Sequence, residues 1–288
     1  MTRALLLVLL LVTNLASGYA EGEATLTVVT YNVRKAGLDR GALSWESRRP
    51  GALEILTEAE ADLVGLQEAA VVQRRDLEGL GLACVGCGAD FSNRNAILFD
   101  ESRLVLVESG VFWLSETPQV PFSVSWGNEG WPRWVTWAQF RLRDAGSESR
   151  RFVVYNTHLD HRAPQSRLPS LELILEHAAR HAGQLPLLLL GDFNARPNRQ
   201  VVRLLMEANS AYPHLPLNDV LAQAGASRYE VTYRSFVNPA EAARLDYIFA
   251  SQEFGYREAE VMTHDSRWES PPSDHHPVRA VLTLRDER

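Results

Sequence analysis

The chain contains six short polar segments, and each lies at the end of an apolar run that has the length of a buried strand. They are Tyr31-Asn32, Gln67-Glu68, Thr157-His158-Leu159-Asp160, Gly191-Asp192-Phe193-Asn194, Leu245-Asp246-Tyr247 and Ser273-Asp274-His275-His276. Because polar groups at the ends of several strands can meet at one edge of a sheet, we expect a single site. The segments supply carboxylate, carboxamide and imidazole groups, without a thiol or a serine elbow. This set suits a hard cation and a phosphate group.

The order of elements along the chain indicates an α/β fold. Apolar or alternating runs predict strands at residues 26–33, 62–67, 96–99, 104–114, 135–142, 152–157, 185–190, 244–250 and 278–284. Amphipathic stretches predict helices at residues 44–59, 71–80, 168–182 and 200–208, with Ser44 as the first N-cap. A polar hairpin is expected at residues 144–149. Helices and strands interleave, so we expect a two-sheet sandwich with helices outside.

The first twenty residues have the pattern of a secretory signal. Arg3 precedes an apolar stretch from Ala4 to Val12, and small residues follow up to Ala20. The apolar stretch is shorter than the roughly 20 residues that a membrane-spanning helix needs. We therefore expect cleavage near Ala20, one domain over residues 21–288, and secretion to an extracellular or periplasmic space. An uncleaved membrane anchor is the alternative.

The charge of the chain argues against a general nucleic-acid binder. The 288 residues carry a net charge of −7, and loss of Arg3 with the signal leaves 28 basic against 36 acidic residues, a net charge of −8. Proteins that bind nucleic acid are usually basic. Nucleic acid is therefore a possible substrate through a local basic cleft, but not the preferred one.

Cys84 and Cys87 are the two cysteines of the chain and form a C-x-x-C pair. No second pair accompanies them, which excludes a zinc ribbon. A small-loop disulfide is expected outside the cytoplasm, and two buried free thiols at a strand end are the equal alternative.

Glu68 and the segment around Asp192 carry the clearest catalytic chemistry. Glu68 ends an apolar run, where a carboxylate is costly unless it is paired or bound to a metal. Magnesium takes few protein carboxylates, so Glu68 fits that role. Asp192 and Asn194 lie two residues apart and point the same way, so one can accept a proton from water while the other donates to phosphate. Taken singly, a salt-bridged glutamate and an ordinary turn would explain these residues.

Two histidines add groups that suit a phosphate. His158 is placed for phosphate contact, and His275, between prolines that stiffen its segment, can hold a proton for a phosphate or a leaving group. Asp246 is the carboxylate expected to orient His275. Asn32 follows a strand core, where its amide could orient Glu68 or a metal-bound water.

In this order and spacing, eight residues together resemble the endonuclease/exonuclease/phosphatase superfamily, which has the deoxyribonuclease-like fold: Asn32, Glu68, His158, Asp192, Asn194, Asp246, Asp274 and His275. The resemblance covers about residues 25–285. It implies a four-layer αββα sandwich of two mixed sheets and metal-dependent hydrolysis of phosphoric esters, with Mg²⁺ or Mn²⁺. It also implies that Glu68 is the main metal ligand, helped by Asn32 and Asp274.

The same resemblance implies roles for the other five residues. Asp192 positions or deprotonates the attacking water. Three side chains hold the phosphate, namely Asn194, His158 and His275. Asp246 supports His275.

Three further residues are expected to contact the substrate. Arg133 has a guanidinium that matches phosphate oxygens, and stacking on the neighbouring tryptophans is the equal alternative. Asn95 stands just before an expected strand, where the resemblance leads us to expect a polar residue. Arg162 is a candidate contact for which a surface charge pair is the simpler interpretation.

We therefore expect a secreted, monomeric, metal-dependent hydrolase of a small or lipid-linked phosphodiester or phosphomonoester. The lipid-linked alternative draws on tryptophans between Trp113 and Trp137, for which packing is the simpler explanation. An extracellular endo- or exonuclease is the alternative with the same chemistry. A catalytically inactive binding module on this fold is the alternative of another class. The presence of all four main catalytic residues favours an enzyme: Glu68, Asp192, Asp274 and His275.

Overall fold

The computed structural model describes residues 24–87, 94–128, 130–143, 150–181, 183, 185–207, 217–227, 230–263 and 268–284. The expected signal at residues 1–20 and the expected hairpin at residues 144–149 lie outside these residues. Within the described part, no helix is both long enough and apolar enough to cross a membrane.

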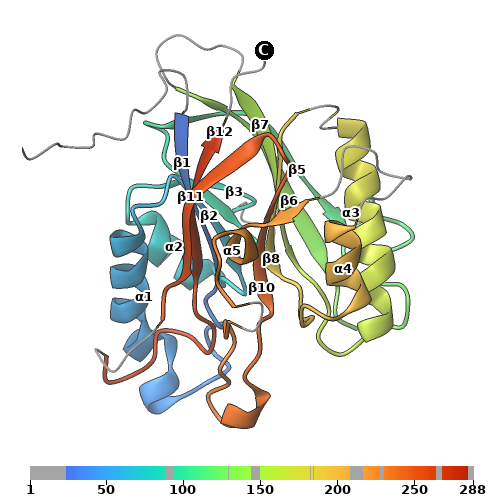
Figure 1. Ribbon diagram of the computed structural model, residues 1–288. Coiled ribbons are helices and arrows are strands. Elements are labelled where there is room, and N and C mark those ends of the chain that lie inside the picture. Colours follow the sequence, from blue (N-terminus) through green and yellow to red (C-terminus); the bar gives the residue numbers. More distant parts are fainter. Residues whose placement is uncertain are drawn as a thin grey trace, which may run out of the picture.

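One six-stranded sheet joins the two ends of the described chain. Its strands lie in the order β11 (Phe254–Val261), β12 (Val278–Leu284), β1 (Ala24–Asn32), β2 (Leu63–Gln67), β4 (Ile97–Phe99) and β3 (Ala83–Val85). β1 and β2 are parallel, and Asn32 pairs with Gln67 where both strands end. Helices α1 (Trp45–Ala59) and α2 (Val71–Glu78) lie on the outer side of this sheet (Figure 1).

The second six-stranded sheet lies in the order β5 (Leu104–Trp113), β6 (Trp134–Leu142), β7 (Arg151–His158), β8 (Leu187–Asp192), β10 (Asp246–Ala250) and β9 (Asn218–Asp219). β7 and β8 are parallel, whereas β10 is antiparallel to β8. Helices α3 (Arg167–His181) and α4 (Gln200–Met206) cover the outer face, and α5 (Val220–Gln223) precedes β10 (Figure 1). Three short 3-10 turns complete the elements: η1 (Gly41–Leu43), η2 (Pro164–Ser166) and η3 (Pro239–Glu241).

Three apolar clusters separate the layers. One fills the space between the two sheets, where Leu63 of β2 and Ile248 of β10 are fully buried. The second joins the first sheet to α1 and α2, and the third joins the second sheet to α3 and α4. Burial of apolar surface at these three levels produces the αββα order of layers. The expected fold class is therefore confirmed.

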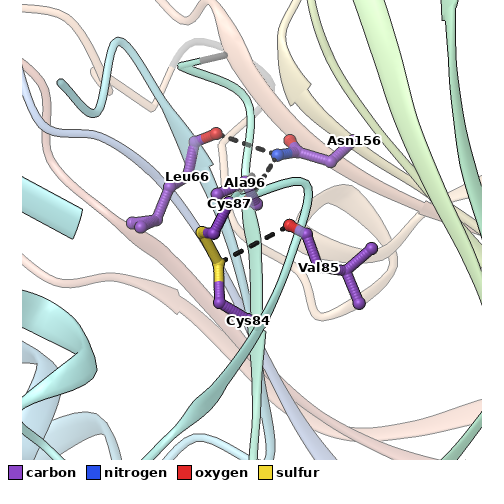
Figure 2. Close-up of a disulfide and its surroundings, with 6 residues drawn as sticks. All are labelled: Leu66, Cys84, Val85, Cys87, Ala96 and Asn156. Carbon is purple, nitrogen blue, oxygen red and sulfur yellow. Dashed lines mark hydrogen bonds between the residues drawn. A yellow bond between two sulfur atoms is a disulfide. The ribbon is translucent and has the colours of Figure 1, made fainter. Parts of the chain in front are cut away.

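A buried polar network joins the two sheets. Asn156 on β7 donates from Nδ2 to the carbonyl oxygens of Leu66 and Ala96, at 2.8 and 2.9 Å (Figure 2). Gln67 donates from Nε2 to Asn156 Oδ1 at 2.7 Å. Buried polar groups are costly unless they are hydrogen-bonded, so this network fixes how β2 and β7 lie against each other.

The two cysteines are joined in a disulfide at the edge of the first sheet. Cys84 lies on β3 and Cys87 just after it, with their Cα atoms 5.9 Å apart (Figure 2). Of the two alternatives that the sequence left open, the structure has the disulfide.

Most expected elements are present within a few residues of their expected ends. Ser44 caps α1 as expected, since its Oγ accepts a hydrogen bond from the Ser47 backbone N at 3.4 Å. Four elements were not predicted from the sequence: β3, β9, β11 and α5. β11 was missed because it is a charged, largely exposed edge strand, whose sequence Phe-Gly-Tyr-Arg-Glu-Ala-Glu-Val lacks an apolar run.

Candidate active site

Strand ends from both sheets converge at one edge of the sandwich. His158 ends β7, Asp192 ends β8 and Asp246 begins the antiparallel β10, so pairing between these strands places the three side by side. Asn32 ends β1 of the other sheet and donates from Nδ2 to Asp192 Oδ2 at 3.1 Å. The sequence segments that predicted one site therefore do meet.

The backbone around this edge is unusual. Gly191 has φ of 145°, and a Cβ there would overlap the carbonyl oxygen of Thr157 on β7, so only glycine fits before Asp192. Glu68 and Asn194 have φ of 59° and 47°, a left-handed conformation that non-glycine residues rarely adopt. Conformations of this kind cluster at functional sites, where the surrounding structure enforces them.

Asp192 is the centre of the site. Besides the amide of Asn32, its Oδ2 faces His158 Nε2 at 3.4 Å and His275 Nε2 at 3.8 Å. Its Oδ1 accepts a hydrogen bond from the backbone N of Asn194 at 2.8 Å. We call the buried group of Asn32, Asp192, Asp246 and His275 the catalytic floor.

The pairing expected between Asp246 and His275 is present. His275 Nδ1 and Asp246 Oδ2 are 2.8 Å apart, which leaves Nε2 directed at Asp192. Thr232 Oγ1 accepts a hydrogen bond from the backbone N of Asp246 at 3.1 Å, and the ring of Tyr233 packs on His275 at 4.8 Å. Neither supporting residue was predicted from the sequence, because a lone Thr-Tyr pair carries no distinguishing pattern.

Burial and neighbouring charges separate the protonation states of these groups. Burial, with the charge of Asp246, raises the pKa of Asp192 to about 7. Burial opposes charge on His275, but the charge and hydrogen bond of Asp246, together with the charges of Asp192 and Asp274, outweigh burial and raise the pKa of His275 to about 10. Burial and then the charge of Arg133 hold the pKa of His158 well below its ordinary value. At neutral pH His275 therefore carries a proton on both nitrogens, whereas His158 is neutral.

Glu68 lies beside the floor and is only half-buried. Its Oε2 accepts a hydrogen bond from the backbone N of Lys35 at 2.9 Å, and Oε1 lies 3.5 Å from Asn32 Nδ2. Asp274 is buried, and its Oδ2 accepts from Arg34 Nη1 at 3.2 Å. Arg34 was not expected, although it follows the Tyr31-Asn32 segment directly.

Two sets of side chains could hold a divalent cation. In one, the ligand atoms all lie within 4.8 Å of one another: Asp192, Asp246 and His275. Its imidazole, protonated at neutral pH, already offsets one of the two carboxylate charges. The other is the expected set of Glu68, Asn32 and Asp274, which offers oxygen atoms alone, the ligands that magnesium prefers. Burial raises the pKa of Asp274, and the nearby charge of Glu68 raises it further. A cation between these carboxylates would offset both the cost of burying the charge of Asp274 and its repulsion by Glu68. The residues fit a hard cation.

A pocket of about 280 Å³ opens next to Glu68 and His158. All three residues expected to contact the substrate line it: Asn95, Arg133 and Arg162. Arg133 donates from Nε to Asp160 Oδ2 at 3.1 Å, so a carboxylate holds its guanidinium. Asn95 donates to the carbonyl of Trp134 at 3.0 Å. Arg162 lies over the ring of Trp131, at 5.0 Å.

The pocket also contains cations that the sequence analysis did not select: Arg34, Lys35 and Arg94. Lys35 is the only lysine of the chain, which is the one signal that could have drawn attention to it. Asn194, expected to hold phosphate, uses one hydrogen of its amide for the carbonyl of Leu159 at 2.9 Å, and the other remains for a ligand.

A model of the endonuclease/exonuclease/phosphatase family matches residues 29–275. An endonuclease/exonuclease/phosphatase family protein from Bacteroides thetaiotaomicron has a similar structure, with 29% identity and a TM-score of 0.78; the match covers 92% of this chain and 99% of that one. A mannosyl-6-phosphatase from Bacteroides thetaiotaomicron VPI-5482 shares 28% identity with a TM-score of 0.73, covering 89% and 99% of the two chains. Protein angel of Drosophila melanogaster is 27% identical over 258 residues, which are 79% of this chain and 68% of that protein.

Proposed function

Because this chain belongs to the endonuclease/exonuclease/phosphatase family and is a hydrolase of phosphoric esters, we propose that it acts with a divalent cation on a compact phosphate ester. One observation carries the proposal. The Asp192 carboxylate lies between the amide of Asn32 and the protonated His275, with the half-exposed Glu68 beside them. This arrangement supplies a proton acceptor, a cationic donor and a place for a metal.

Glu68, Asn32 and Asp274 would hold the cation, magnesium or manganese. When bound, such a cation neutralises charge on the phosphate and lowers the pKa of water.

The residues of the floor then do the proton chemistry. Asp192 accepts the proton of the attacking water, and a pKa near 7 suits a general base at neutral pH. His275 donates from Nε2 to a phosphate oxygen, and its charge strengthens that hydrogen bond. Asp246 holds the imidazole at Nδ1 and keeps the ring oriented. His158 remains neutral and donates to the phosphate from the same edge of the sheet.

The size of the pocket and the charge of the chain support a compact substrate. A volume of about 280 Å³ is at the lower end of the range for ligand pockets. The net charge of −7 gives no long-range attraction to a polyanion, so long nucleic acid is not the preferred substrate. The similar mannosyl-6-phosphatase supports a phosphomonoester.

We also propose export of a soluble monomer after cleavage near Ala20. This rests on the signal pattern of residues 1–20. Recovery of an intact N-terminus in the membrane fraction would contradict it.

The test is hydrolysis by the purified residues 21–288 of a panel with matched concentrations of phosphate: a sugar phosphate, a mononucleotide, an inositol phosphate, sphingomyelin and duplex DNA. We expect turnover of a small ester with magnesium or manganese, loss of turnover after chelation, and recovery when the metal is restored. Undiminished turnover after exhaustive chelation would refute the role of the metal. A specificity constant for DNA that is orders of magnitude higher would replace the compact substrate with a nuclease activity.

A further inference from the structure

The pocket beside Glu68 holds more positive charge than one phosphate group requires. Among the residues that the structure describes, Glu68 is the only carboxylate that lines it. Five basic side chains line it as well: Arg34, Lys35, Arg94, Arg133 and Arg162. The chain as a whole is acidic, with a net charge of −7. The lining of the pocket is therefore positively charged, although the net charge of the chain is negative.

Two of the five cations are already paired with carboxylates. Arg34 donates to both oxygens of Asp39, at 2.9 and 3.1 Å, and to Asp274. Arg133 donates to Asp160 at 3.1 Å. These two guanidiniums are held by the protein itself and serve to position the pocket.

The other three basic side chains are Lys35, Arg94 and Arg162. We call these three, together with Trp131, the cationic wall. Within the described part of the chain, none of the three cations makes an ion pair with a carboxylate. Arg94 is half-buried, and burial lowers its pKa, a cost that the nearby charge of Glu68 offsets only in part.

Trp131 gives the wall a fixed shape. The residue is 47% exposed, and the guanidinium of Arg162 lies over its ring at 5.0 Å. Arg162 Nε also donates to His161 Nε2 at 3.2 Å, which limits how the side chain can turn. A guanidinium fixed on one face still presents N–H groups at its edge, and these match the oxygens of a phosphate.

The scissile phosphate does not need the wall. In the proposed mechanism that phosphate is held by His158 and His275, which both face Asp192, and by the cation that Glu68, Asn32 and Asp274 would bind. We propose that the cationic wall binds a second phosphate group of the substrate, so that the preferred compact ester carries two phosphates on one small scaffold. This inference rests on the proposed function, because the second group is defined relative to the one that is hydrolysed.

Binding to the metal-free protein tests the wall without turnover. Calorimetric titration in chelator would compare fructose 1,6-bisphosphate with fructose 6-phosphate, which share a scaffold. We expect the bisphosphate to bind about tenfold more tightly, as one additional charge-assisted contact provides. Arg162→Gln, at an exposed side chain, should bring that ratio close to one and change the affinity for the monophosphate much less. Lys35→Gln should act in the same direction.

Arg203→Gln is the matched control, because it removes the same charge from an exposed position on α4, outside the pocket. It should leave the ratio unchanged. Equal affinities of the wild-type protein for the two sugars, or a ratio that neither wall variant lowers, would overturn the inference.

A second arm separates this inference from the proposed function. It measures hydrolysis of both sugars with magnesium. Absence of hydrolysis of both sugars and of every other ester of the panel, with magnesium or manganese and with a preserved binding ratio, would refute the proposed function and leave the wall standing. Normal hydrolysis without any preference for the bisphosphate, in binding or in kcat/KM, would refute the wall and leave the proposed function standing.

Discussion

The catalytic floor and the cationic wall both lie next to Glu68 and His158, which line the pocket, but the two groups are built in opposite ways. In the floor, side chains are buried and hold one another: Asn32 holds Asp192, and Asp246 holds His275. In the wall, Lys35 and Arg94 are half-buried and Arg162 is exposed, and none of them makes an ion pair with a carboxylate of the described residues. Groups that hold one another keep a fixed geometry for chemistry. Groups with free donors remain available to a ligand.

The largest effect is expected in the floor, from Asp192→Asn. The amide keeps the shape of the carboxylate but cannot accept the proton of water, so kcat should fall about 10²–10⁴-fold. Binding of the bisphosphate to the metal-free protein should change little. Steady-state kinetics measures kcat, and calorimetry measures the affinity for the bisphosphate. A fall in binding that matches the fall in rate would show that floor and wall are not separate.

Glu68→Gln should lower the rate about 10²–10³-fold at fixed metal concentration, because it removes the charge proposed to hold the cation. The free energy of unfolding should change little, since Glu68 is half-exposed. Metal titration followed by calorimetry and kinetics checks this. Near wild-type turnover at saturating metal would mean that Glu68 has a structural role.

His275→Ala and Asp246→Asn should each lower kcat about 10²-fold, and the double variant should be little worse than the worse single variant. The reason is that Asp246 acts through the imidazole, and residues that act as a unit are not additive. Losses that multiply would show that the two side chains act separately.

Alkaline pH should weaken the floor of the metal-free protein before it affects the arginines of the wall. The pKa of His275 is raised from 6.5 to about 10, so its stabilisation is fully present below pH 6.5 and is lost as the pH rises through 10. The free energy of unfolding should fall by roughly 1–3 kcal/mol more in the wild type than in His275→Gln between pH 7 and 10.5. Denaturant titrations in chelator measure the difference. Parallel pH profiles would contradict the protonated state of His275.

The floor could be predicted from the sequence largely because strand ends carry it. Asp192 follows a continuous apolar run, and its neighbours on β7 and β10 follow or precede similar runs. The pairing partner of His275 could also be named, since an aspartate at the end of another strand was available. The contacts of Thr232 could not be predicted, because they depend on a loop that returns to the sheet by way of an isolated bridge between Tyr233 and His275.

The wall could not be predicted in the same way. Lys35 and Arg94 lie in loops without periodicity, and Trp131 is one of seven tryptophans that the sequence cannot sort into buried and exposed. For Arg162, the sequence left open both a substrate contact and a surface charge pair. Whether a basic side chain has a carboxylate partner depends on distant residues, as the pairing of Arg133 with Asp160 shows. The edge strand β11 was missed for a related reason, because its charged residues give no apolar signal.

The division between floor and wall is tested most directly by a double-mutant cycle between Asp246→Asn and Arg162→Gln, with kcat/KM for the bisphosphate as the measured quantity. If one region does the chemistry and the other holds the second phosphate, the two losses should multiply, which means that their free energies add within about 0.5 kcal/mol. In addition, Arg162→Gln alone should raise KM with little change in kcat. A double variant no worse than Asp246→Asn alone, or a loss of kcat from Arg162→Gln as large as that from Asp246→Asn, would contradict the account.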